Sequence, residues 1–85
     1  MNSQVVIDKL IEQLESFGLE YREWIGFAHY LDVLGGKKSR FGVMFDTITY
    51  GWEDADGSYQ SELFFIKNNK VDEAVQEAVM FAVGR

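Results

Sequence analysis

A hairpin pattern in the second half of the chain constrains the fold more than any other feature. From Phe41 to Ile66, apolar and polar residues mostly alternate on both sides of an acidic turn at residues 53–58. Such alternation is typical of half-buried strands. The turn contains Asp56-Gly57, a pair that favours a chain reversal between two such runs. A hairpin alone is marginally stable in water, so we expect the rest of the chain to cover its apolar face.

Two amphipathic helices are predicted, one at each end of the chain. The first covers residues 3–17, with Ser3 as its N-cap and Gly18 as the left-handed residue that follows it. The second covers residues 70–83, begins after Asn68-Asn69 and ends at Gly84. Their apolar stripes are Ile7, Leu10, Ile11, Leu14 and Phe17, and Val71, Ala74, Val75, Ala78, Val79 and Ala82.

The stretch from Leu19 to Leu34 fits two interpretations. Its apolar residues alternate as in a strand that Gly26 interrupts, but Tyr21, Trp24 and Leu31 also fall near one face of a helix. Glycine costs about 1 kcal/mol inside a helix, and aromatic residues suit a pleated sheet. We therefore prefer a strand, with the helix as the alternative. A turn at residues 35–39 then leads into the hairpin, because Gly35 and Gly36 permit positive φ.

The expected fold is α+β, one small domain over residues 1–85 in the order α-β-β-β-α. An antiparallel sheet with a central β-hairpin packs two helices on one face. On an uninterrupted first hairpin strand, Met44, Ile48 and Tyr50 lie opposite Phe41, Val43 and Phe45. Two helices on one side cannot bury both sets, so an apolar outer face and a homodimer are expected.

The last helix begins Asn69-Lys70-Val71-Asp72-Glu73-Ala74. The order of elements resembles that of double-stranded RNA-binding domains, whose last helix begins with lysines that contact phosphates. Two acids stand at this position here, so we do not expect direct binding of nucleic acid.

Charge and composition narrow the partners. The chain has 14 acids and 8 bases, a formal charge of −6, no cysteine and 15% aromatic residues. Negative charge disfavours nucleic acid and anionic lipid and favours a basic protein surface. Residues 1–4 lack the features of a secretory signal, and no apolar run reaches membrane-spanning length. We expect a cytoplasmic protein that is not bound to a membrane.

No residue pattern predicts an enzyme, a metal site or a cofactor. His29 is the only histidine and has no cysteine or second histidine to form a ligand set. We expect it to be a sheet residue with one satisfied hydrogen bond. The sequence from Asp54 to Glu62 resembles the start of a calcium loop, but Tyr59 stands where that loop needs glycine.

Aromatic and acidic residues gather around the predicted hairpin turn, and we expect them to bind a partner protein. Aromatic anchors supply binding energy, and carboxylates steer a basic partner. The predicted contact residues are Asp46, Trp52, Glu53, Asp54, Asp56 and Tyr59. Alternatively, Trp52 and Tyr59 form a cross-strand pair and the acids only solubilise the turn.

The predicted function is a non-enzymatic inhibitor that docks on the basic surface of a nucleic-acid-binding protein by imitating phosphate charge. Phage-encoded antagonists are a class of this size and charge. The alternative is a self-associating structural component, or a toxin-immunity-type protein without mimicry. The basic cluster of Lys37, Lys38 and Arg40 is either a second contact site or a solubilising turn.

Overall fold

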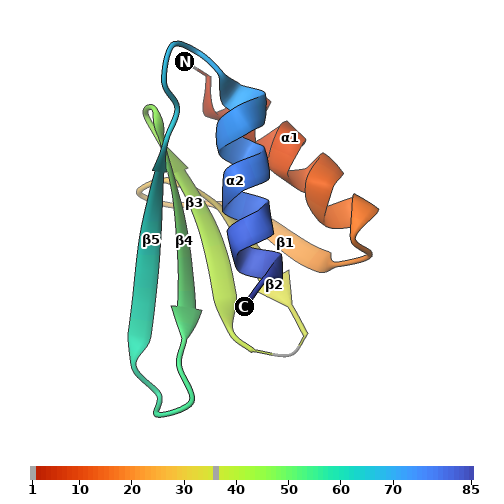
Figure 1. Ribbon diagram of the computed structural model, residues 1–85, viewed down its shortest axis with the longest axis vertical. Helices are drawn as coiled ribbons and strands as arrows, with labels where there is room; N and C mark the ends of the chain where they lie inside the picture. The colour runs from red at the N-terminus through yellow and green to blue at the C-terminus, as the bar shows by residue number, and fades with distance from the viewer. Residues whose placement is uncertain (1, 36) are drawn as a thin grey trace.

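Two helices and a five-stranded antiparallel sheet make up the fold. The structure is a computed structural model that describes residues 2–35 and 37–85. The elements are, in order, α1 (Ser3–Ser16), β1 (Glu20–Ile25), β2 (His29–Leu34), β3 (Ser39–Met44), β4 (Thr47–Glu53), β5 (Tyr59–Phe65) and α2 (Val71–Val83). Each strand pairs with the next along the chain, and both helices cover the same face of the sheet (Figure 1). The α+β class and the placement of the helices are confirmed.

Helix α1 ends as its sequence predicts. Gly18 has φ 72°, the N–H of Leu19 donates to the Leu14 carbonyl, and the N–H of Gly18 donates to the Glu15 carbonyl. This is the Schellman arrangement expected from glycine after a helix. The N-cap is Asn2 rather than Ser3, because the Asn2 side chain accepts a hydrogen bond from the N–H of Gln4 at 2.8 Å.

The stretch from Leu19 to Leu34 is extended, so the helical alternative is wrong, but it forms two strands rather than one. Strands β1 and β2 are joined at Gly26, whose N–H donates to the Ala28 carbonyl at 2.9 Å. Trp24 and Tyr30 are direct cross-strand partners, with ring centroids 4.4 Å apart. This stacking is available only to a hairpin, since on one strand the two rings would lie far apart.

The Phe41–Ile66 stretch contains three strands, so the expected total of three strands is wrong, and the described residues form five. A tight turn at Phe45-Asp46 separates β3 from β4, and Met44 pairs with Thr47 across it. Phe45 takes φ 55° there, a conformation that aromatic residues rarely adopt. The sequence pattern therefore contains no turn signal at this point. With five strands, the element order also differs from that of RNA-binding domains.

The turn at Phe45 decides which residues are buried. It reverses the chain so that Ile48 pairs with Val43 and Tyr50 with Phe41, which puts all four on the helix-facing side. The prediction that Ile48 and Tyr50 lie on the outer face is therefore wrong, and only Met44 does. Phe45, expected to face inward, lies in the turn and is 81% exposed.

The core lies between the sheet and the helix layer. Helix α1 packs on β1, β2 and β3, helix α2 packs on β4 and β5, and the two helices contact each other. The fully buried large side chains are Val6, Ile7, Leu10, Leu14, Leu31, Phe41, Val43, Ile48, Val75 and Val79. The predicted stripe of α2 is confirmed at Ala74, Val75, Ala78 and Val79. The chain therefore buries one face of the sheet and leaves the other, called the open face below, uncovered by helices.

Two connections, the β2–β3 turn and the segment between β5 and α2, partly match their predictions. Gly35 has φ 82° in the β2–β3 turn, and Gly36, the second predicted glycine of that turn, lies outside the described residues. Asn68 and Asn69 both have positive φ before α2, which asparagine tolerates better than most residues. They reverse the chain, but α2 has no side-chain cap.

Candidate binding surfaces

The β4–β5 turn brings together three of the six predicted contact residues, Glu53, Asp54 and Asp56. The N–H of Asp54 donates to the Ser58 carbonyl at 2.7 Å, and Gly57 has φ 87°. The N–H of Ser58 donates to Asp56 Oδ1 at 3.0 Å, and this hydrogen bond holds the pKa of Asp56 below its ordinary value. Aspartate, glycine and serine, which are the residue types typical of turns, therefore form this turn.

The two predicted anchors lie on opposite faces of the sheet. Trp52 pairs with Gln60, and Tyr59 pairs with Glu53, so the two rings are not a cross-strand pair. Trp52 is half-buried on the helix-facing side, with its centroid 5.5 Å from that of Phe81 and 5.6 Å from that of Tyr50. Tyr59 is 58% exposed on the open face. A single partner surface cannot use both as anchors.

Tyr59 lies flat on the sheet rather than projecting from it. A side chain at Gly51 would overlap the Tyr59 hydroxyl, so the glycine provides the space for the ring. Burial raises the pKa of Tyr59 above its ordinary value.

Asp46 belongs to the opposite end of the sheet. It lies in the β3–β4 turn, separated from Glu53 by the whole of β4, about 20 Å for a strand of this length. The six predicted residues thus do not form one surface.

Basic groups lie beside the acidic turn. The N–H of Glu53 donates to the Lys38 carbonyl at 3.1 Å, and a shallow pocket of about 470 Å³ is lined by Lys37, Lys38, Glu53, Asp54 and Ala55. On the other side of the turn, the Arg85 guanidinium lies 4.0 Å from Asp54. The turn is therefore not an isolated negative patch.

The outer side of the helix layer is the acidic surface of the molecule. Six acids are exposed on α1 and α2, and Lys9 is the only basic residue of these two helices. The helices therefore carry −5 of the formal −6 charge. Lys9 is paired with Asp72 at 2.7 Å. The acids are Asp8, Glu12, Glu15, Asp72, Glu73 and Glu77. Net charge alone does not reveal this distribution, but a charge count over the two predicted helices does.

The open face carries an ion-pair cluster beside the stacked rings of Trp24 and Tyr30. Asp32 is 8% exposed and accepts hydrogen bonds from Arg22 at 2.9 Å and Arg40 at 2.6 Å. Burial acts to raise the pKa of Asp32, but the hydrogen bonds from Arg22 and Arg40 outweigh it, so this pKa is lowered. The Arg40 guanidinium also lies 4.8 Å from the centre of the Trp24 ring. Arg40 is thus engaged in a structural cluster, unlike Lys37 and Lys38, which are exposed.

His29 bridges three elements. Its ring is 6% exposed, with Nε2 2.6 Å from Glu23 of β1 and Nδ1 3.5 Å from the hydroxyl of Ser3 in α1. Both ring nitrogens are occupied and the ring is buried, so a substrate has no access to either. This matches the structural role expected for His29, with two partners instead of one.

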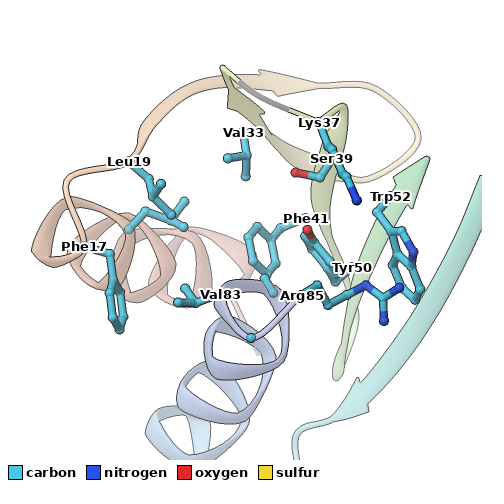
Figure 2. A pocket seen from close by; sticks show the side chains of 13 residues that line it. Phe17, Leu19, Val33, Lys37, Ser39, Phe41, Tyr50, Trp52, Val83 and Arg85 are labelled. Atoms are coloured by element: carbon cyan, nitrogen blue, oxygen red, sulfur yellow. The ribbon is translucent and has the colours of Figure 1, made fainter. Parts of the chain in front are cut away.

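An open pocket lies between the C-terminal ends of the helices and the sheet (Figure 2). It has a volume of about 570 Å³, and its walls are mostly apolar. Arg85 extends across it, with its guanidinium 3.9 Å from the centre of the Trp52 ring. Arg85, one of the two cationic residues that line this pocket together with Lys37, is therefore already engaged by Trp52 and Asp54.

Three large apolar side chains are strongly exposed at the hairpin connections. Phe27 in the β1–β2 connection is 98% exposed, Phe45 in the β3–β4 turn is 81% exposed, and Ile25 at the end of β1 is 76% exposed. Both connections lie at the same end of the antiparallel sheet. Phe27 is not among the predicted contact residues, because one phenylalanine after a glycine carries no periodic signal.

Comparisons with protein-family models, with curated proteins and with solved structures found no match to this chain. Within residues 2–35 and 37–85, no helix has the length and apolarity to cross a membrane. The same residues contain no group of three or more side chains arranged to hold a metal ion.

Proposed function

We propose that the protein is a non-enzymatic protein-binding domain that docks on a basic surface of its partner through the outer side of α1 and α2. The concentration of negative charge on these helices is the observation that carries the proposal. Opposite charge on a partner speeds encounter and fixes orientation.

The specific form of this proposal is an inhibitor that imitates nucleic-acid charge. Asp8, Glu12 and Glu15 are spaced four and three residues apart on α1, and Glu73 and Glu77 are four apart on α2. Helical residues at these spacings lie about 5–6 Å apart, so each helix presents a row of carboxylates. A protein that holds phosphates with Lys and Arg offers the matching surface.

Paired charge reversals test which acidic surface docks. Glu12→Lys with Glu77→Lys changes the helix layer at positions with no hydrogen bond or ion pair within the described chain. Glu53→Lys with Asp56→Lys makes an equal change at the β4–β5 turn. Each variant is immobilised as bait for proteins of the native host, and the captured protein is then titrated against each variant. We expect the helix variant to lose roughly tenfold or more in affinity and the turn variant to lose little.

Salt provides the second part of this test. Affinity for the captured protein should fall steeply between about 0.05 and 0.5 M salt, because exposed charges are screened over that range. Unchanged affinity at the higher salt would contradict docking by charge. A loss confined to the turn variant would move the docking surface to the β4–β5 turn.

A further inference from the structure

Strand β5 is an edge of the sheet with one side unoccupied by the described chain. The N–H of Ile66 donates to the Asp46 carbonyl, and the Ser58 carbonyl accepts from the N–H of Asp54, so the backbone groups of the even-numbered residues of this segment face β4. Backbone groups alternate along a strand. The N–H and C=O groups of Tyr59, Ser61, Leu63 and Phe65 therefore point away from the sheet.

The two edges of the sheet differ in how they are protected. In β1, three of six residues are charged, namely Glu20, Arg22 and Glu23. In β5, Glu62 is the only charged residue among seven, and the strand contains neither lysine nor proline. Charged side chains and prolines are the usual means of preventing edge-to-edge pairing. The β5 edge has only Glu62 as such protection along seven regularly paired residues.

The β5 edge also exposes apolar surface on the open face. Tyr59 is 58% exposed, Leu63 52% and Phe65 58%. Leu63 and Phe65 stand beside the unoccupied edge, so another strand placed there would cover part of each, whereas the Tyr59 ring lies over Gly51 of β4. A second strand would thus satisfy backbone groups and bury apolar area together.

We propose that two copies of this chain join through β5 in an antiparallel pairing centred on Ser61, so that one sheet continues across both chains. A twofold axis perpendicular to the sheet keeps the open faces on the same side, and each chain then offers the same strand to the other. Ser61 faces Ser61, Tyr59 faces Leu63, and Gln60 faces Glu62. About six hydrogen bonds form between the chains.

The pairing of charges and side chains across the two strands favours this register, and it favours a second copy of the chain as the occupant of the β5 edge. Centred on Ser61, each Gln60 amide lies opposite a Glu62 carboxylate, and each Tyr59 occupies the position opposite a Leu63, in pairs that stabilise sheets. Centred on Glu62, two carboxylates would face each other, which is unfavourable. Centred on Leu63, the carboxylate would face Phe64 and lose the amide partner. The complementary groups of the Ser61 register all come from one strand, so a second copy supplies them.

Cysteine cross-linking tests the pairing directly because the chain has no cysteine of its own. Directly opposite residues in a hydrogen-bonded pair have Cα atoms about 5.5 Å apart, within disulfide range. Under mild oxidation at tens of micromolar, we expect Ser61→Cys to form a covalent dimer rapidly. Glu20→Cys, at an exposed position of the β1 edge, is the matched control and should stay monomeric. Equal cross-linking of both variants would indicate random collision and overturn the proposal.

Sedimentation equilibrium gives the independent measurement. The unmodified chain should sediment as a dimer, and Leu63→Lys should sediment as a monomer with unchanged circular dichroism, because position 63 is half exposed on the open face. A monomeric unmodified chain at about 1 mM would overturn the proposal. The Glu12→Lys with Glu77→Lys variant should still dimerise, since the pairing uses no helix residue. Loss of partner docking and loss of dimerisation are therefore distinguishable.

Discussion

At the scale of single residues, Phe45 is held in an unfavourable backbone conformation. Its φ is 55° and its ring is 81% exposed, so the folded chain gains little contact in return. Asparagine is several-fold enriched at positive φ. We expect Phe45→Asn to raise the free energy of unfolding by about 0.5–1 kcal/mol, measured by urea denaturation.

Phe27→Asn is the matched control for that prediction. Phe27 is 98% exposed and does not have a positive φ, so the same substitution should change stability by less than about 0.5 kcal/mol. Equal effects at both positions would show that the backbone of Phe45 is not strained. If Phe45→Asn lowers stability, the ring makes contacts that outweigh the strain.

Asp32 makes stability depend on pH. Its carboxylate is nearly buried between Arg22 and Arg40, and its pKa is below the ordinary value in the folded state. A lowered pKa means that the ionised form contributes stability above the unfolded-state pKa, and that this contribution is lost as pH falls through the folded-state pKa. We expect Asp32→Asn to lower the free energy of unfolding by about 2–3 kcal/mol at pH 7.

The pH dependence distinguishes charge from packing. At low pH, the native Asp32 is protonated too, so the difference between the two proteins should shrink below the usual range for aspartate. Urea midpoints from pH 7 down to pH 2 measure it, with Glu20→Gln as an exposed control. A difference that stays constant over this range would show that Asp32 acts through its shape alone.

At the scale of elements, Trp52 joins helix α2 to the sheet. Phe81 of α2 packs against Tyr50, Trp52 and Phe64, with centroids 5.5–6.2 Å from its own. Trp52→Ala would leave Phe81 poorly packed, and we expect it to lower the free energy of unfolding by about 2–4 kcal/mol. Thermal or urea unfolding followed by circular dichroism measures this change.

Tyr59→Ala is the comparison for Trp52→Ala, since Tyr59 is mostly exposed and lies on the other face. Its cost should be about 1 kcal/mol or less. If both variants were equally stable, Trp52 would not belong to the core. The β4–β5 hairpin also shows why the six predicted contact residues do not form one surface. Successive residues of a strand point to opposite faces of the sheet, so residues that are close in the sequence of a hairpin need not share a face.

The helices were predictable because their signals are local. The glycine after α1 and the apolar stripe of α2 each act within a few residues of the chain. The strands were harder, because the break at Phe45-Asp46 carries none of the residues that mark turns. One missed turn then changed the expected face of Ile48, Tyr50 and Phe45, since a strand alternates with a period of two.

At the scale of the whole molecule, charge is divided between the two sides of the sheet. The helix layer holds nearly all of the net negative charge, while Arg22 and Arg40 lie on the open face with Asp32. In the proposed dimer both helix layers lie on the same side of the joined sheet, so two acidic surfaces face the same way. A partner with two basic sites could then be bound twice.

The sequence by itself determined the helices, the acidic turn at residues 53–58, the small single-core size and the net charge, because these follow from local spacing and composition. Only the tertiary structure decided that there are five strands, that Trp52 and Tyr59 face opposite ways, and that β5 is the less protected edge. Those features depend on the side of the sheet to which each residue turns. A single reversal of the chain at Phe45 sets that for every residue of the strand that follows it.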